Sequence, residues 1–318
     1  MKAIWLNIPG WMYIVVEALG MIAATSLSAA LLPMELTVHG GGVEVVDWVV
    51  EQDLDLSVLF ASSKVDRERV GVGVGVVETD EAGWELALTI CQINPATAEG
   101  LHTVCWQVAG ALVPRQTRHF RIKLREQRDT STPDEPVGLK WIDDQAIVTN
   151  GPITMTHRRA DGGLIGTVGV NESQTQLAWG DKLADGRAEY KLWGHNAARI
   201  DVLATGPLRA AYQCRTEYLH GANEAVSHLS ATYRFTTYAG QPVTHVQAIV
   251  HQMFSEQWRS LHFIELHLAD MPVDEYIADS EAGRLSGSGQ FFGGKQWAAV
   301  YGHRMLVGVC SGASPGSF

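Results

Sequence analysis

The fold class is indicated most clearly by the stretch VSHLSATYRFTTYAGQPVTHVQAIVHQMF (226–254). Apolar and polar residues alternate along both of its halves, and the segment YAGQP (238–242) interrupts the alternation. Alternation with a period of two is typical of a β-strand that buries one face, and Gly and Pro between two such runs favour a turn. The stretch therefore predicts two antiparallel strands, over 226–236 and 243–254, that form a hairpin.

Each predicted strand has an apolar face and a polar face. In the first strand, Tyr233 and Phe235 share the apolar face, whereas His228 and Arg234 share the polar one. The preceding segment, 207–218, alternates in the same way. Three such strands predict an antiparallel meander with one face on a core and the other toward water or a ligand. The polar face would carry Arg209, Arg215, His228, Arg234, His245, Gln247 and His251.

The turns suggest a register for this meander. We expect Thr236 to face Val243, and Glu217 to face Val226. Two rows would then cross the three strands, Arg215–His228–His251 and Arg209–Arg234–His245. A slip of two residues would change these partners but keep the faces.

This polar face is open to two interpretations. Like charges opposed across strands are destabilising unless an anion or a carboxylate lies among them. One interpretation is therefore a ligand face that binds an anion. The other is a solvated outer face with neutral histidines, on which Glu217 helps to balance the charge.

The rest of the sequence predicts an all-β protein. Short alternating runs separated by Gly, Pro and Asp continue from residue 37 onward, as in sandwiches and barrels. The polar segment EQRDTSTPDEPVG (126–138) is the clearest linker. We expect a leading segment over 1–36, a small β-barrel or β-sandwich domain over 37–126, a linker over 127–139, and a larger antiparallel β domain over 140–318.

Composition limits the classes of function. The 318 residues are 46% hydrophobic and 19% charged, as in a globular protein, with a net charge of −11. A general nucleic-acid binder would carry a basic field, so we expect no nucleic-acid partner. A local basic patch for an acidic ligand stays open.

The first 36 residues differ from the rest of the chain. The run ALGMIAATSLSAALLPM (18–34) is apolar, with a length that suits the core of a secretion signal and lies near the lower limit for a membrane span. A packed N-terminal helix, or an incorrectly assigned translation start, fits the same residues. A secretion signal would make the protein secreted or periplasmic, and an uncleaved segment would be its contact with a membrane.

Four cysteines show no C-x-x-C spacing, so we expect no zinc site built on cysteines. No liganding spacing supports a calcium site among Asp143, Asp144 and Asp161, so we expect no other metal site. Cys91 and Cys105 fall on two strands that we expect to be neighbours. They fit either a disulfide in an oxidising compartment or two small buried apolar side chains.

The stretch GVGVGVV (71–77) is not a nucleotide-binding loop. Its glycines have the spacing G-x-G-x-G, and no helix pattern follows, whereas the dinucleotide fingerprint requires G-x-G-x-x-G and a helix. We expect no cofactor, and a strand whose glycine face lies against something bulky.

The segment WGHNAAR (193–199) is a second candidate site. His195 and Asn196 follow a tryptophan in a predicted loop, a combination that suits a sugar. A turn in which Asn adopts a permissive backbone conformation explains the same residues.

Several of these segments together resemble a known group of enzymes. The stretches IDVLATGPLRAAYQCRTEY, ATYRFTTYAGQPVTHVQAIV and SLHFIELHL are similar to the galactose mutarotase-like β-supersandwich of polysaccharide lyases, of the exo-rhamnogalacturonan-lyase type. HTVCWQVAGALVPRQTRHFRIKL (102–124) is similar to the end of the small barrel that precedes such sandwiches. Members usually continue further than this chain, which leaves a partial chain as one interpretation.

The resemblance implies a partner and a chemistry, namely β-elimination on a uronate-containing polysaccharide. Such a reaction needs cations to neutralise the C6 carboxylate, a base for the C5 proton and an acid for the leaving oxygen. Arg209, Arg215 and Arg234 would bind the carboxylate, with Gln247, His195 and Asn196 as further substrate contacts. His228, His245 and His251 are candidates for the base, and Tyr218 and Tyr238 for the acid. The alternatives are a non-catalytic carbohydrate-binding sandwich and a structural β protein without a ligand.

Overall fold

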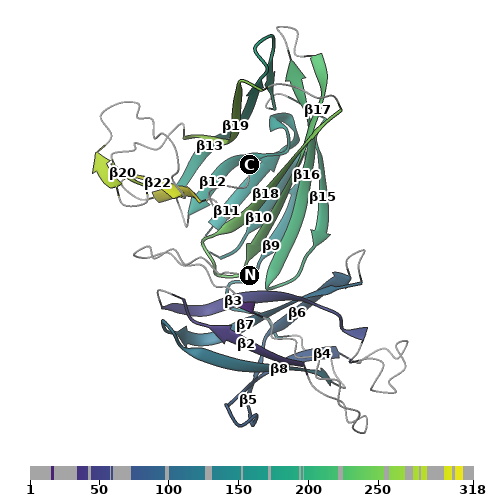
Figure 1. Cartoon of the computed structure of the whole chain (residues 1–318), viewed down its shortest axis with the longest axis vertical. Helices are drawn as coiled ribbons and strands as arrows, with labels where there is room; N and C mark the ends of the chain where they lie inside the picture. Colours follow the sequence, from purple (N-terminus) through teal and green to yellow (C-terminus); the bar gives the residue numbers. More distant parts are fainter. Residues whose placement is uncertain are drawn as a thin grey trace.

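The structure of the chain is a computed structural model (Figure 1). It describes residues 16–17, 34–41, 44–57, 59, 73–96, 100–125, 131–151, 153–170, 173–192, 195, 197–220, 225–253, 258–268, 275–278, 281–284, 297–302 and 305–310. For residues 16–17, 96, 170 and 173–181, and for most described residues from 260 onward, it describes the backbone only.

A small β-sandwich comes first in the chain and lies below the larger unit in Figure 1. One sheet has the strand order β1-β2-β8-β4-β5, and the other has the order β3-β7-β6. Buried side chains from both sheets, including Trp106, Phe120 and Ile122, fill the space between them. The strands are β1 (Val16–Glu17), β2 (Met34–His39), β3 (Val45–Leu54), β4 (Gly73–Thr79), β5 (Glu85–Thr89), β6 (Cys91–Ala96), β7 (His102–Leu112) and β8 (Thr117–Arg125).

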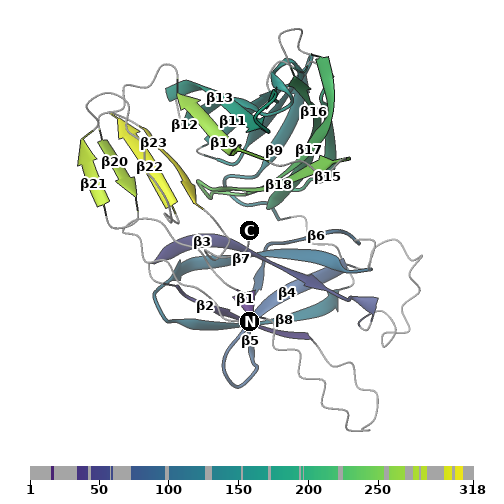
Figure 2. The same ribbon diagram turned by 45° about the horizontal axis from the view of Figure 1, so that its top comes forward.

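The larger unit is one strongly curved antiparallel sheet. Its strand order is β18-β17-β16-β14-β13-β12-β11-β10-β9, with β15 beside β16 and β19 beside β13. Figure 2 shows these strands bent into a half-barrel, with a separate four-stranded sheet, β21-β20-β22-β23, to one side. The bounds are β9 (Gly138–Ile142), β10 (Gln145–Thr149), β11 (Ile153–Arg158), β12 (Ile165–Val170), β13 (Ser173–Ala184), β14 (Glu189–Lys191), β15 (Arg199–Ala204), β16 (Arg209–His220), β17 (Ala225–Tyr238), β18 (Thr244–Gln252), β19 (Ser260–Leu268), β20 (Glu275–Ala278), β21 (Glu281–Arg284), β22 (Trp297–Gly302) and β23 (Met305–Cys310).

The half-barrel closes around an apolar core that contains one buried histidine. Tyr212, Tyr233 and Phe235 are fully buried there, together with His157 from β11. The His157 Nδ1 lies 3.1 Å from the carbonyl oxygen of Gly163, and its Nε2 lies 2.9 Å from the Tyr212 hydroxyl. A carbonyl oxygen only accepts, so Nδ1 carries the proton and Nε2 accepts from the hydroxyl. Burial lowers the pKa of His157 to about 4, so the ring is neutral at neutral pH.

The predicted all-β fold class is confirmed, and so is the meander with its two faces. β17 and β18 form the hairpin predicted from the opening stretch, and β16 pairs with the other side of β17. The apolar residues Tyr233 and Phe235 lie in the core, whereas Arg234 on the opposite face is exposed. The faces follow from strand alternation alone, which explains why the sequence was sufficient to assign them.

The predicted register is wrong on both sides of β17. Arg234 faces Gln247 instead of His245, because the β17–β18 pairing is shifted by two residues. Arg215 faces Thr232 instead of His228, because the turn after β16 is tighter than assumed and a bulge interrupts the pairing between Glu217 and Leu219.

The segment expected over 1–36 overlaps the small sandwich at its end. β2 begins at Met34, and Leu36 is buried in the core between the sheets. Residues 18–33, which carry the apolar run, lie outside the described residues. Within the described part of the chain, no helix is long and apolar enough to span a membrane.

Cys91 and Cys105 lie on neighbouring strands, as expected, but they do not form a disulfide. Cys91 is opposite Trp106, and Cys105 is opposite Gln92, so the two side chains point to opposite faces of the sheet. Both cysteines are free thiols. The disulfide alternative is therefore excluded by a register offset of one residue.

The glycine face of β4 lies against a long side chain, as the sequence predicted. A Cβ atom placed on Gly75 would lie 2.4 Å from the Cδ of Arg125, which crosses the strand at that point. The glycine thus provides room for the aliphatic part of an arginine.

Candidate functional site

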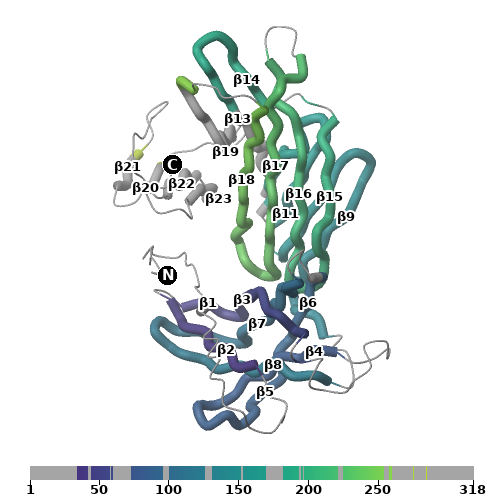
Figure 3. The backbone as a smooth tube through the Cα atoms, turned by 45° about the vertical axis from the view of Figure 1, so that its right-hand side comes forward, coloured from purple at the N-terminus to yellow at the C-terminus, as the bar shows by residue number. Residues whose placement is uncertain are grey.

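The candidate polar residues lie on the face of β16, β17 and β18 that points away from the half-barrel core; we call it the outer face. Figure 3 shows β18, β17, β16 and β15 side by side, with β18 at the border of the sheet. Four rows cross this face, and each joins residues that face one another across neighbouring strands. They are Glu217–Ser230–His251, Arg215–Thr232–Ile249, Gln213–Arg234–Gln247 and Ala211–Thr236–His245.

Arg215 is balanced by a carboxylate of the protein itself. It lies opposite Arg199 of β15, and Asp201 lies between the two guanidinium groups. The Asp201 Oδ1 is 2.6 Å from Nε of Arg199, and its Oδ2 is 3.8 Å from Nε of Arg215. The hydrogen bond from Arg199 holds the pKa of Asp201 below its usual value. Asp201 therefore supplies the carboxylate that opposed cations require.

Arg234 has no such partner among the residues that the structure describes. Its side chain is exposed, and within the described residues it makes no ion pair. Two glutamines, Gln213 and Gln247, flank it across the strands. The amide oxygen of Gln213, oriented by its hydrogen bonds, accepts from Nε and Nη2 of Arg215 at 3.1 and 2.7 Å. The centre of the outer face is therefore a cation between two amides.

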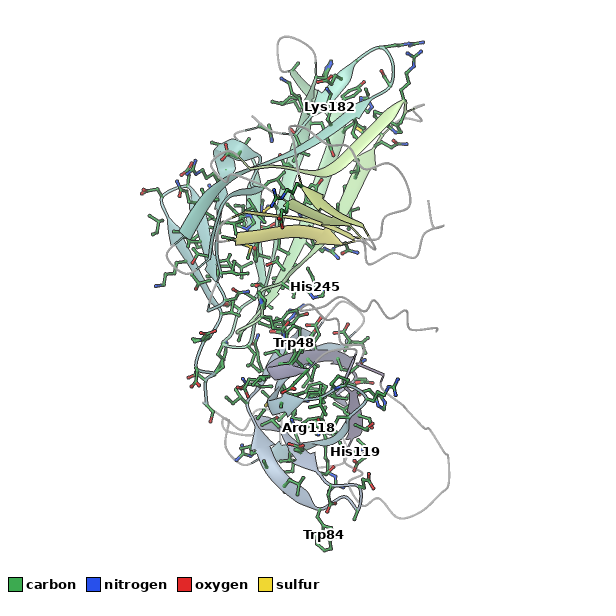
Figure 4. All side chains as sticks on the ribbon, turned by 90° about the vertical axis from the view of Figure 1, so that its left-hand side faces the viewer. Trp48, Trp84, Arg118, His119, Lys182 and His245 are labelled. Atoms are coloured by element: carbon green, nitrogen blue, oxygen red, sulfur yellow. The ribbon has the colours of Figure 1, made fainter. Side chains whose placement is uncertain are left out.

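The lower end of the outer face meets the small sandwich. Arg209 begins β16 opposite Tyr238, and its Nε lies 2.6 Å from Oε2 of Glu51 on β3. The ring centroids of Tyr238 and His245 are 5.6 Å apart, edge to face. Figure 4 shows His245 at the end of the half-barrel nearest the small unit. Glu51, Arg209, Tyr238 and His245 form what we call the junction cluster.

The junction cluster is partly buried, and the pKa values of Arg209, Tyr238 and His245 are all shifted there; that of Arg209 is raised, with the charge of Glu51 acting against burial. Burial raises the pKa of Tyr238 well above its usual value, and the charge of Glu51 adds to that shift. Burial lowers the pKa of His245, with Arg209 acting in the same direction and Glu51 against it. His245 is nevertheless accessible to solvent. At neutral pH the cluster thus presents a neutral imidazole beside a protonated phenol.

A set of buried hydrogen bonds fixes the junction. The Oε1 of Gln92, on β6, accepts from the backbone nitrogens of Leu208 and Arg209 at 2.9 Å each. The Nε2 of Gln92 donates to the carbonyl oxygen of Arg209 at 3.0 Å. From the other side, Nε2 of Gln241 donates to the carbonyl oxygen of Val49 at 2.7 Å.

Three of the predicted base and acid candidates lie apart from the junction cluster. Tyr218 is fully buried in the core, on the opposite face of β16, so the structure does not bring it to the candidate arginines. The His228 ring lies 5.9 Å from that of Tyr190, at the upper end of the sheet. His251 is exposed on β18, opposite Ser230.

The second candidate segment is also apart from the outer-face arginines. His195 is buried, and its Nδ1 lies 3.2 Å from Oγ1 of Thr216. Its Nε2 lies 3.7 Å from Oε2 of Glu217. Asn196 lies outside the described residues. His195 is therefore held by β16 on the side of Thr216 and Glu217.

The sequence missed two acidic members of the site. Alternation along 198–204 could have placed Asp201 beside the outer face, since β15 follows that period. Glu51 carried no local signal, because it belongs to the small sandwich and reaches Arg209 only through the packing of the two units.

The described residues contain no cluster of three or more His, Cys, Asp or Glu side chains that could hold a metal ion. Comparison of the sequence with known proteins gives no match, either to a protein-family model or to a curated protein. The resemblance to polysaccharide lyases stays a prediction.

Proposed function

We propose that the protein binds an acidic, uronate-containing polysaccharide on the outer face of its half-barrel. The observation that carries this proposal is Arg234, an exposed guanidinium without an ion pair in the described structure, set between Gln213 and Gln247. A guanidinium binds a carboxylate with two parallel hydrogen bonds, and the exposed amide of Gln247 suits sugar hydroxyls, whereas Gln213 is buried and held by Arg215. Ser230 and Thr232 extend the polar surface along the same strand.

The other arginines have different parts in this proposal. Arg215 shares Asp201 with Arg199, so the local group of two guanidinium ions and one carboxylate keeps a positive charge that favours an acidic chain. Arg209 is held by Glu51 and serves to position the junction.

Binding is tested by retention on immobilised polygalacturonate, with neutral galactan as the control matrix. We expect Arg234→Gln to weaken binding by about tenfold or more, since hydrogen bonds to charged groups contribute about 1.5–3 kcal/mol. The matched control is Lys140→Gln, which removes an exposed cation from β9 at the opposite border of the sheet. Equal binding of both variants, or equal retention on galactan, would contradict the proposal.

A second candidate function is cleavage of the same polymer by β-elimination. The contact between His245 and Tyr238 favours it, because a neutral base and a protonated acid lie side by side near Arg209. His245 would take the C5 proton, the C4–O bond would break, and Tyr238 would protonate the leaving oxygen, which leaves a C4–C5 double bond.

The ultraviolet absorbance of the unsaturated uronate measures this reaction directly. We expect product from the unsubstituted chain, loss with Tyr238→Phe and with His245→Gln, and retention with His251→Gln, a control on the same strand. Retention on polygalacturonate without any product would identify a non-catalytic binding module.

A further inference from the structure

Strand β18 forms an open border of the large sheet. No strand in the described part of the chain pairs with its free edge, and β17 occupies the other edge. Figure 3 shows β18 in front, as the last of the row formed with β17, β16 and β15. An unpaired edge exposes backbone N–H and C=O groups that can pair with another strand.

The sequence of this edge lacks the usual protection. Proteins blunt edge strands with lysines, prolines or inward-pointing charges. The nine residues of β18, THVQAIVHQ, contain no Pro, Lys, Arg, Asp or Glu. Ala248, at the middle of the strand, is exposed although its neighbours Val246 and Val250 pack partly against the core.

The strand is also nearly palindromic. From His245 to His251 it reads HVQAIVH, so an antiparallel copy centred on Ala248 places like residues opposite each other, except that Gln247 faces Ile249. His245 would face His251 of the second copy, Val246 would face its Val250, and Ala248 would face its own counterpart. A two-fold interface requires this kind of self-complementary surface.

We propose that two copies of this chain associate by pairing their β18 strands antiparallel about Ala248. The paired edges join the two half-barrel sheets into one continuous sheet, with the valines on the core side. On the outer side, two symmetric histidine pairs, each His245 with His251 of the other copy, lie directly opposed. This association does not depend on glycan binding.

The histidine pairs make the association sensitive to pH. Like charges that are directly opposed across strands are destabilising, so protonation of both members weakens the pairing. Around His245 lie Tyr238, Arg209 and Glu51, and the last two carry opposite charges. Next to His251 lies Ser230, with Glu217 beyond it in the same row. Because the pKa of His245 lies below its usual value, only part of the effect falls between pH 7.5 and pH 5.5, where we expect about a threefold rise in the dissociation constant of the dimer.

Sedimentation equilibrium of the full chain tests the pairing. We expect concentration-dependent dimers at pH 7.5, and monomers for Ala248→Lys, which places two opposed ammonium groups at the axis. The matched control is Leu203→Lys, which adds the same charge at an exposed position of β15 and should leave the dimer unchanged. Monomers of the unsubstituted chain at every concentration would overturn the proposal.

Cross-linking tests the register. Ala248→Cys should be joined rapidly to its counterpart by a short bismaleimide, whereas Leu203→Cys and the unsubstituted chain should not. Equal rates for the three would exclude this arrangement. The double variant His245→Gln, His251→Gln should keep the dimer and lose its pH dependence; a dimer that still weakens at pH 5.5 would refute the role of the histidines.

Discussion

At the scale of single residues, the polar side chains divide into those that the fold has already satisfied and those that it leaves available. Glu51 pairs with Arg209, and Asp201 balances part of the charge of Arg199 and Arg215, so the number of arginines overstates the positive charge that the outer face offers to a ligand. Arg234 is the cation for which the described residues provide no such partner. The charge balance of a β face is therefore decided by the carboxylates on neighbouring strands.

His157 gives a prediction at this scale. Its pKa is about 4 in the folded chain and about 6.5 when exposed, so protonation favours the unfolded chain. The contribution of the neutral ring to the free energy of unfolding is complete above pH 6.5 and declines as the pH falls toward 4. We expect a loss of about 2 kcal/mol in the free energy of unfolding between pH 6.5 and pH 5, measured by urea denaturation.

Two variants separate this effect from other titrating groups. His157→Leu lowers stability at every pH, since it leaves the Tyr212 hydroxyl without its acceptor, but its stability should depend less on pH in this range. His119→Gln, at a partly exposed histidine of the small sandwich, should keep the full dependence. The same pH slope in His157→Leu as in the unsubstituted chain would refute the assignment.

At the scale of elements, the β17–β18 hairpin depends on one glycine. Gly240 has φ of 66°, in the left-handed region, and Gln241 N donates to Tyr238 O at 3.3 Å across the turn. A Cβ atom on Gly240 would meet nothing closer than 3.9 Å, so a substitution there strains the backbone without a clash. We expect Gly240→Ala to cost about 1 kcal/mol in thermal or urea unfolding, and Gly240→Asn to cost less, because Asn tolerates this conformation. Equal costs for the two variants would point to packing instead.

The elements also show what the sequence alone could predict. The period of two along 226–254 was sufficient for the strands, the turn and the two faces, because alternation fixes which side chains share a face. The register could not be predicted from alternation. It depends on the bulge after Glu217 and on the number of residues between β16 and β17, which together make Thr232 instead of His228 the cross-strand partner of Arg215. The contact of Glu51 with Arg209 depends on the packing of the two units, which no local pattern encodes.

At the scale of the whole molecule, the two units share a continuous junction. Val49 and Cys105 from the small sandwich pack with Leu208, Ala210 and Tyr238 from the half-barrel in one buried apolar cluster. The junction cluster of polar groups lies beside it. We therefore expect the two units to unfold together. Their separation would expose the apolar cluster and break the hydrogen bonds that Gln92 and Gln241 make across the junction.

Gln92 is the residue whose removal should uncouple them. Its side chain makes three hydrogen bonds with the backbone of Leu208 and Arg209, so Gln92→Ala leaves buried donors and an acceptor unpaired. Each unsatisfied group costs about 1–3 kcal/mol, and this loss falls on the junction while both cores stay intact. In calorimetry we expect one transition for the unsubstituted chain and two for Gln92→Ala. Gln52→Ala, which removes a single hydrogen bond to the carbonyl of Asp53 on the same small sandwich, should keep one transition. A single, unshifted transition in Gln92→Ala would mean that the apolar cluster alone couples the units.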